Sequence, residues 1–329
     1  IPALPGRISL SSAIQEGGRT VSAGRGSLRH ALIVAQVAVS FVLLIGAGLM
    51  LQSVMRLQSV DPGIQTDSVL SMRVALNFSK YTTPALRAQF LAELGDRLRA
   101  LPGVRSAGGA GTFPLNEGGG FLAGVRVEGE PEVEAARLPR AEVQSASPGY
   151  FQTVGIPLLR GRLFDERDIA DREVVAVISD SMARQFFRTA DAVGARISTD
   201  NGRSWTRIVG VVGDVRSTLS AQPSQTLYRP LAQAPLLTVM FLARTSGDPA
   251  ALMQQMRGAV HAIDAQQPVD QFRTLDEVRS ASLSAPRLTA TLIGVFAGSA
   301  LLITAAGLAG VIAFSVNQRS QEFGVRMAL

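Results

Sequence analysis

Two long uncharged segments constrain this chain more than any other feature. The first covers residues 31–51 (ALIVAQVAVSFVLLIGAGLML), and the second comprises the 31 residues between Arg287 and Arg319. A helix rises about 1.5 Å per residue, so each segment can cross the roughly 30 Å hydrocarbon core of a bilayer. Both exceed the roughly 7–15 apolar residues of a signal peptide. The sequence therefore predicts transmembrane helices over residues 31–53 and 287–316, whereas a buried core helix is the less favoured alternative.

Arginines flank both segments on the sides that lead to the two chain ends. They are Arg19, Arg25, Arg29, Arg319 and Arg326. Because positive residues next to a span favour the cytoplasm, both ends are predicted to be cytoplasmic. Residues 1–30 then form a cytoplasmic linker, residues 57–286 form an extracytoplasmic domain, and residues 317–329 form a cytoplasmic coupling segment. We expect the chain, which starts at Ile1, to be part of a longer polypeptide.

Composition excludes several function classes. The chain has no cysteine, which rules out disulfides, thiolate-bound metals and thiol catalysis. Its one lysine, Lys80, follows no glycine-rich loop, so no nucleotide-binding P-loop is present in this sequence. Of the net charge of +6, +3 lies in residues 1–30 and +1 in residues 317–329, and no basic, aromatic-rich stripe is present, so we expect no nucleic-acid partner.

The region between the spans has the pattern of an α+β domain. Residues 69–76 alternate as a half-buried strand does, Thr83-Pro84 then provides a helix start, and an apolar helix face follows up to residue 101. Residues 104–112 return as a strand. Residues 236–273 repeat the order, with Asp248-Pro249 as the helix start. These two stretches predict two related βαβ units.

The segment between these units is predicted to form a second subdomain. Its clearest strands cover residues 173–179 and 207–215, and Asp180 is expected to cap a short helix after the first of them. The predicted fold class is therefore an α+β extracytoplasmic domain, built from βαβ units in two subdomains, between two transmembrane α-helices.

Three groups of residues could suggest chemistry, and each has a simpler interpretation. The two histidines, His30 and His261, lack a visible nucleophile partner and are interpreted as surface or structurally satisfied residues. The acidic run at residues 165–171 lacks calcium-loop spacing and is interpreted as a solvated loop. The glycine runs at 108–111 and 118–120 precede no helix and are interpreted as flexible connections. The sequence thus predicts no enzyme, no metal and no cofactor in this chain.

Polar and small residues inside the spans indicate protein neighbours. Gln36 and Ser40 interrupt the first apolar segment and are expected to face protein instead of lipid. Gly294 and Gly298 are four residues apart in the second span and would allow another helix to approach closely.

Several segments, in order, resemble one protein family. They are LRHALIVAQVAVSFVLLIGAGLMLQSVMRLQSVDPG from residue 28, GYFQTVGIPLLRGRLF from residue 149, then VVAVISDSMARQFF, DAVGARI and RIVGVVGDVR, and finally NQRSQEFGVRMAL. These segments resemble MacB/FtsX-like ABC transporter permeases, in particular the duplicated orphan permease group with its MacB-like periplasmic core domain. Residues 1–27 resemble the linker between the two halves of that group.

The resemblance implies a permease of the bacterial inner membrane with its large domain in the periplasm. A separate cytoplasmic ABC ATPase would bind ATP, and its hydrolysis would change the periplasmic domain through the helices, a mechanotransmission that serves export or efflux. Other expected partners are further permease helices or a second permease half. The coupling candidates are Arg319, Glu322, Phe323 and Arg326, because Phe323 and Met327 share a helical face in a short amphipathic helix.

Two other classes have the same two-span topology. A membrane sensor or receptor would carry an extracytoplasmic ligand-binding domain and continue into a signalling coiled coil or kinase. The tail after residue 316 has no heptad pattern. A membrane-anchored enzyme would show a convergent catalytic cluster, which this sequence does not display.

Overall fold

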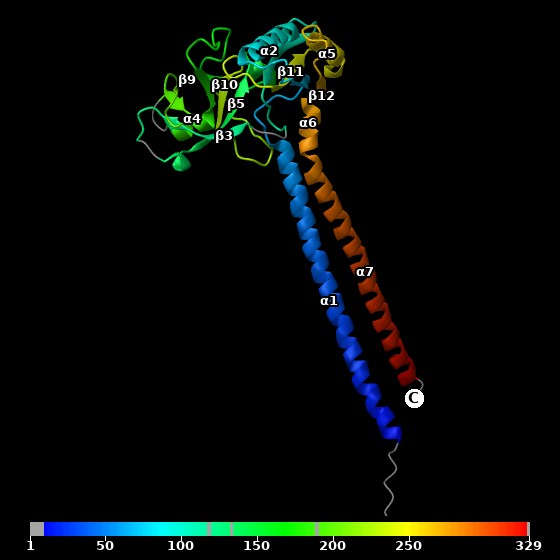
Figure 1. The fold of residues 1–329 in the computed structure, drawn as a ribbon. Helices are drawn as coiled ribbons and strands as arrows, with labels where there is room; N and C mark the ends of the chain where they lie inside the picture. The colour runs from blue at the N-terminus through cyan, green and yellow to red at the C-terminus, as the bar shows by residue number, and fades with distance from the viewer. Residues whose placement is uncertain (1–9, 117–119, 132–133, 188–190, 328–329) are drawn as a thin grey trace, which may run out of the picture. The chain divides into compact units, whose positions relative to one another are not determined.

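The computed structural model describes residues 10–116, 120–131, 134–187 and 191–327 (Figure 1). The chain forms two compact units. We call Ile1–Gln58 with Ser284–Leu329 the helix unit, and Ser59–Leu283 the sheet unit. Each unit is described by itself.

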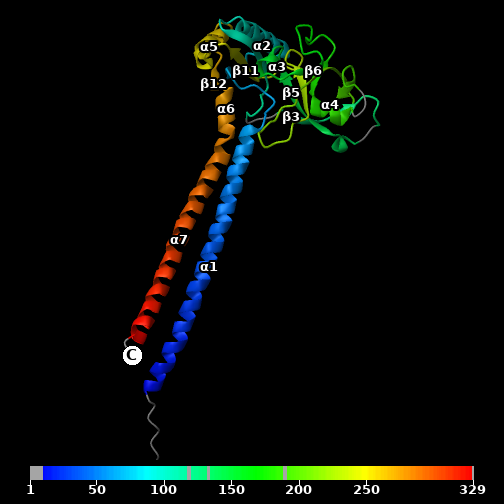
Figure 2. The same ribbon diagram turned by 180° about the vertical axis from the view of Figure 1, so that it is seen from behind.

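The helix unit consists of two long helices that run side by side, α1 (Leu10–Ser59) and α7 (Ser284–Met327) (Figures 1 and 2). Both are long and apolar enough to cross a membrane, and only 6% of the most apolar stretch of each is buried. A core helix of a water-soluble protein would be covered, so the core-helix alternative is wrong. Helix α7 continues unbroken to Met327, so the separate short helix predicted near the C-terminus is also wrong.

Four strands of the sheet unit form the first subdomain. Their order is β12 (Val269–Thr274), β1 (Val69–Ala75), β11 (Thr238–Thr245) and β2 (Val104–Ala110), and neighbours are antiparallel. Helix α2 (Pro84–Arg99) connects β1 to β2. The short helix η2 (Pro249–Leu252) and helix α5 (Met253–His261) connect β11 to β12. Each pair of connected strands encloses a strand of the other pair, which is the ferredoxin-like arrangement of two split βαβ units.

The helix starts predicted for this subdomain are confirmed. Thr83 accepts a hydrogen bond from Leu86 N, and Pro84 is the first residue of α2. Asp248 accepts from Ala250 N, although the turn that it caps is the 3₁₀-helix η2 and α5 follows it directly. The apolar faces of α2 and α5 pack with the strands in one core. Its largest fully buried members are Leu70, Met72, Leu94, Leu98 and Phe241.

The second subdomain lies between β2 and β11 in sequence and extends the same sheet. The strand order continues from β2 as β5 (Arg140–Ala146), β10 (Thr226–Pro230), β7 (Val175–Ser179), β9 (Thr206–Val212), β8 (Arg196–Ser198) and β4 (Arg126–Val127). In addition, β3 (Phe121–Gly124) pairs with β5, and β6 (Leu158–Gly161) pairs with β9. Parallel and antiparallel pairs alternate, as in β5–β10, β10–β7 and β7–β9. The predicted mixed sheet in two subdomains is confirmed.

The helices in the sequence between β2 and β11 are short. They are η1 (Ala135–Arg137), α3 (Tyr150–Val154) and α4 (Asp180–Phe186), of which α3 packs on β2 and β11 of the first subdomain. The N-cap of α4 is Ser179, whose hydroxyl accepts from Met182 N, so the predicted capping role of Asp180 is wrong. A separate core fills the second subdomain, with Ile178, Met182 and Ile208 fully buried.

The two subdomains meet at the ends of β2 and β5. These strands share one residue pair, Ala110 and Ala146. Helix α3 packs directly onto β2, where a Cβ atom at Gly108 would lie 2.4 Å from Tyr150 N. Gly108 is therefore required for close backbone contact, and the predicted flexible connection at 108–111 is wrong. In the second glycine run, Gly118 and Gly119 lie outside the described residues.

Candidate functional site

A polar contact joins the two helices of the helix unit. The hydroxyl of Ser40 lies 2.7 Å from Thr304 Oγ1 and 2.8 Å from Gln36 O, and Thr304 donates to Ala300 O at 2.8 Å. Ser40 is only 5% exposed although nearly all of its apolar neighbours in α1 are uncovered. The prediction that Ser40 faces protein is confirmed. In an apolar surrounding, such a contact fixes which faces of two helices meet.

An apolar groove of about 850 Å³ lies along the two helices, nearer the ends that adjoin residues 58 and 287. Its lining combines small and aliphatic residues with three polar ones, namely Leu44, Ala47, Gly48, Leu51, Val54, Gln58, Arg287, Ala290, Thr291, Gly294, Ala297 and Gly298. A Cβ atom at Gly294 or Gly298 would meet no atom within 4 Å. These glycines therefore do not mediate the contact between α1 and α7. Their packing against a further helix stays a prediction.

The predicted coupling residues lie in the last turns of α7. The helical backbone includes Arg319, Glu322, Phe323 and Arg326. Their side chains lie outside the described residues, so their role in binding an ATPase stays a prediction.

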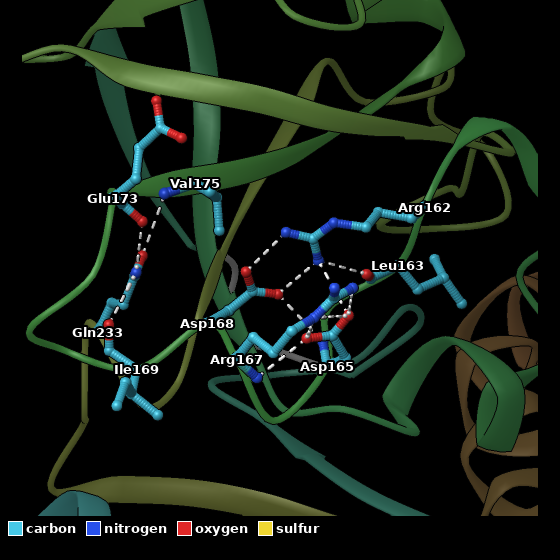
Figure 3. A network of polar contacts seen from close by, with 9 residues as sticks. All are labelled: Arg162, Leu163, Asp165, Arg167, Asp168, Ile169, Glu173, Val175 and Gln233. Atoms are coloured by element: carbon cyan, nitrogen blue, oxygen red, sulfur yellow. Dashed lines mark hydrogen bonds and ion pairs between the residues drawn. The ribbon is translucent and has the colours of Figure 1, made fainter.

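The acidic run of the sheet unit is an ordered ion-pair network (Figure 3). Asp168 is 4% exposed and accepts two hydrogen bonds from the guanidinium of Arg162, at 2.7 and 2.8 Å, and a third from Asp165 N. Arg167 donates to the Asp165 carboxylate and holds the pKa of that carboxyl well below its usual range. The solvated-loop interpretation is wrong for Asp168, because its charge is buried and bidentately paired.

The same loop is fixed at its other end by Gln233 (Figure 3). Its amide nitrogen donates to Ile169 O at 3.1 Å and Glu173 O at 2.8 Å, and its amide oxygen accepts from Val175 N at 3.1 Å. The loop between β6 and β7 is therefore held in one conformation by polar contacts that engage β7 as well as the loop itself.

The histidine interpretation holds where the structure tests it. His261 is exposed at the end of α5, and the side chain of His30 lies outside the described residues. In the described part of the chain, no group of three or more His, Asp or Glu side chains could hold a metal ion.

Sequence reasoning missed Thr304 and Arg244. Thr304 could have been found by pairing the polar positions of the two apolar segments. Arg244 lies at the end of β11 and donates three hydrogen bonds to main-chain carbonyls, including those of Gln65 and Asp67, just after the first span. Nothing in the local sequence around Arg244 distinguishes it from the other arginines of this arginine-rich chain.

The MacB-like periplasmic core domain family model matches residues 31–259, more than two thirds of the chain. The macrolide export ATP-binding/permease protein MacB 2 of Aeromonas hydrophila is 29% identical over 190 residues, which cover 55% of this chain and 29% of that protein. MacB of Rhodopseudomonas palustris is 27% identical over 203 residues, covering 57% of this chain and 30% of the relative. This chain therefore matches about three tenths of these relatives' length.

Another relative is the uncharacterized ABC transporter permease YknZ of Bacillus subtilis. It is 24% identical, and the match covers 57% of this chain and 49% of that protein. Among solved structures, the periplasmic region of MacB from Actinobacillus actinomycetemcomitans aligns with a TM-score of 0.45 at 14% identity, covering 67% of this chain and 94% of that one. The family match, which includes the first span and most of the sheet unit, decides the assignment. The chain is similar to ABC transporter permeases of the MacB/FtsX-like type and belongs to the MacB-like periplasmic core domain family.

Proposed function

We propose that this chain couples ATP hydrolysis by a separate cytoplasmic ABC ATPase to a change in the shape of its periplasmic sheet unit. In this proposal α1 and α7 cross the bacterial inner membrane together with further permease helices or a second permease half. The sheet unit then acts on an exported substrate by mechanical movement, and this chain itself carries no catalytic group. The MacB relatives are named as macrolide export proteins, which supports export as the class of process.

The observation that carries the proposal is the continuity of α7. The helix has 44 residues without a break, from Ser284 to Met327. At about 1.5 Å per residue it is about 66 Å long, roughly twice the hydrocarbon core. One rigid element therefore begins one residue after the sheet unit ends at Leu283 and extends well beyond the span. A displacement at its C-terminal end would be transmitted along the helix, because no proline or loop interrupts it after the first turn.

The proposal places the ATPase contact at the C-terminal end of α7. Phe323 would insert into the ATPase surface, while Glu322 and Arg326 would make polar contacts at its rim, which is the usual anatomy of a small helical anchor. Arg319, one turn nearer the membrane, would lie at the lipid headgroups.

Co-purification tests this contact. In the full-length protein, Phe323→Ala combined with Glu322→Arg should reduce recovery of the ATPase at equal permease expression. Gln321→Ala is the matched control, because Gln321 lies two residues from Phe323 and so on a different face of the helix. Equal ATPase recovery with the double variant and the parent would contradict the proposed contact.

Cysteine labelling tests the orientation, since the chain has no cysteine of its own. Ser220 is exposed in the sheet unit and suits this purpose, whereas Ser198 is 1% exposed and would not react in either orientation. An impermeant thiol reagent added to cells with a permeable outer membrane should label Ser220→Cys and leave Ser12→Cys unlabelled. The reverse pattern would overturn the proposed topology.

The family assignment favours the permease over the two alternatives. A sensor or an anchored enzyme would need a ligand or catalytic site in the sheet unit. The buried carboxylate of Asp168 and the amide of Gln233 are instead saturated by internal partners.

A further inference from the structure

The segment that connects α1 to the first strand, which we call the entry segment (residues 60–68), is not helical but is tightly held. Ile64 and Thr66 are buried in the sheet unit. Its main chain makes hydrogen bonds to both subdomains of that unit, as the following contacts show. Since Ser59 is the last residue of α1, any movement of that helix reaches the sheet unit through these residues first.

Arg244 of β11 holds the entry segment to the first subdomain. Its Nη2 donates to Gln65 O at 2.9 Å, its Nη1 donates to Asp67 O at 2.8 Å, and its Nε donates to Thr153 O of α3 at 3.0 Å. One planar guanidinium thus joins three backbone segments, a geometry that the fork of donors in arginine permits and a lysine ammonium does not. Burial lowers the pKa of Arg244, because partial removal from water disfavours the charged guanidinium.

The entry segment also contacts α3 directly. Gln65 N donates to Val154 O at 2.8 Å, and the side chain of Gln65 occupies the space next to Gly155, where a Cβ atom would come within 2.8 Å of it. Helix α3 is the element that packs onto β2 at the junction of the two subdomains. Arg244 and Gln65 therefore hold the entry segment at this junction.

On its other side the entry segment contacts the second subdomain. Gly63 has φ +79° and lies so close to Asp214 that a Cβ atom would be 2.1 Å from its carbonyl oxygen, and Arg216 N donates to Pro62 O at 3.1 Å. The carboxylate of Asp214 in turn accepts from Ser181 N of α4 at 2.6 Å and from Arg184 at 2.9 Å. Asp214 therefore connects the entry segment to α4 of the second subdomain.

The exit from the sheet unit is different. Helix α6 (Leu275–Ser282) begins with a capping box between Thr274 and Glu277, buries Leu275 and Val278, and lies against β1 and β12. Both strands belong to the first subdomain. The entry segment therefore touches both subdomains, whereas the exit helix is attached to one.

We propose that Arg244 is the positioning residue through which displacement of α1 changes the angle between the two subdomains. When α1 moves, the entry segment, α3 and β11 move as one body, because the Arg244 guanidinium is hydrogen-bonded to both of the others from β11. The close contact of Gly63 with Asp214 then displaces the second subdomain relative to the first. This role rests on the proposed function and requires α1 to move together with α7, to which the Ser40–Thr304 contact joins it.

Spin labels on the two subdomains test the role in the full-length permease, co-expressed with its ATPase and reconstituted in lipid nanodiscs. Gln89 of α2 and Gln185 of α4 are exposed, and the absence of native cysteine allows Gln89→Cys and Gln185→Cys to be labelled selectively. Distances between the labels are measured without nucleotide and with ATP under non-hydrolysing conditions.

We expect ATP to shift the distance distribution in the parent, and Arg244→Gln to abolish that shift without changing the nucleotide-free distance or ATPase recovery. Arg244→Lys keeps the charge but cannot reach three carbonyls, so it should show a reduced shift. Arg73→Gln is the matched control, because Arg73 also lies in the first subdomain but pairs with Asp270 at the surface. It should respond as the parent does.

Three results would overturn the inference. A full ATP-dependent shift in Arg244→Gln would show that Arg244 does not pass on the movement. If that variant fails to fold, a full shift in Arg244→Lys would show the same. A parent whose labels do not respond to ATP would overturn the proposed function itself, and the role of Arg244 with it.

Discussion

The two subdomains of the sheet unit use different means to reach one continuous sheet. In the first subdomain α2 packs mainly on β2 and α5 packs on β12, and both helices add buried apolar residues to the core that the strands form. In the second subdomain the strands are short and the helices supply little of the core. Loops there are held by polar contacts such as Arg162–Asp168. Packing of amphipathic helices on the sheet therefore stabilises the first subdomain, whereas the second depends on backbone and charge contacts.

Gly108 lies in β2, where α3 packs at the junction of the two subdomains, and changing it should have the largest effect. Gly108→Val places a side chain within 2.4–2.8 Å of backbone atoms of Tyr150 and Gly149, which cannot move without displacing α3 from β2. We expect a loss of more than about 4 kcal/mol in the free energy of unfolding, in the range reserved for severe backbone and packing conflicts. Urea denaturation of the detergent-solubilised chain, followed by circular dichroism, measures this loss.

The control for Gly108 is Gly258→Ala in α5. A Cβ atom at Gly258 has open space around it, so this exchange should stabilise the helix by about 0.5–1 kcal/mol. A Gly108→Val protein as stable as the parent would contradict the close packing of α3 on β2.

Core truncations test whether the subdomains unfold separately. Leu94 and Ile178 are fully buried in the first and second cores. Each exchange to alanine should cost about 3 kcal/mol, within the range found for buried leucine and isoleucine. Since β2 and β5 share a single residue pair, we expect the cost to fall mainly on the subdomain that carries the change.

The single tryptophan makes this distinction measurable. Trp205 directly precedes β9 and reports on the second subdomain. Ile178→Ala should lower the urea midpoint of its fluorescence, whereas Leu94→Ala should lower the midpoint of the circular dichroism signal more than that of the fluorescence. Equal shifts of both signals in both variants would show that the two cores unfold as one.

Sequence reasoning succeeded mostly where structure is local. The start of α2 at Thr83-Pro84 and the existence of strand β1 follow from neighbouring residues, and the structure confirms both. The half-buried alternation predicted for β1 is wrong, because four successive residues from Val69 to Met72 are buried. The pairing order could not be predicted, because β11 inserts between β1 and β2 from a position more than 120 residues later in the chain. Strand pairing of this kind is decided by long-range packing.

The same limit applies to the polar contacts. Ser40 was predicted to face protein because a hydroxyl in an apolar helix needs a partner, but its partner Thr304 lies on the other span. The acidic run was interpreted as solvated because alternating charges are usual on a surface, and only the fold shows that Asp168 is enclosed. A charge pattern alone does not distinguish a solvated carboxylate from a buried, paired one.

The Arg162–Asp168 pair should matter less than the cores but more than a surface ion pair. Asp168→Asn leaves Arg162 without its charged partner. Because the guanidinium remains 37% exposed to water, the cost should be about 2 kcal/mol, below the 3–5 kcal/mol typical of fully buried pairs. Asp165→Asn is the control, since its pair with Arg167 is exposed and should contribute less than about 1 kcal/mol. Equal urea midpoints for the two variants, followed by Trp205 fluorescence, would contradict the assigned difference.

The smallest expected effect is the dependence of stability on pH. One carboxylate in each subdomain allows the two subdomains to be compared. In the second subdomain, hydrogen bonds from the side chain and main chain of Ser204 lower the pKa of Asp200 to about 2, and Ser198 adds another. The pKa of an aspartate in an unfolded chain is about 3.9. The folded state therefore binds the proton less readily, so the stabilisation is complete above about pH 4 and is lost as the pH falls toward 2. Asp200 is exposed, and screening by solvent limits the contribution to less than about 1 kcal/mol.

The first subdomain provides the contrast. Asp264 also has a lowered pKa, caused chiefly by the hydrogen bond from Lys80 and also by the one from Tyr81, and it lies far along the sheet from Trp205. Urea midpoints of Trp205 fluorescence are measured at pH 4.5, 3.5 and 2.5. Asp200→Asn keeps an acceptor in the turn and should flatten the dependence of these midpoints on pH, whereas Asp264→Asn should leave their slope unchanged. If Asp264→Asn flattens the slope as much as Asp200→Asn does, protonation in one subdomain is felt throughout the other, and the sheet unit behaves as a single cooperative body in acid.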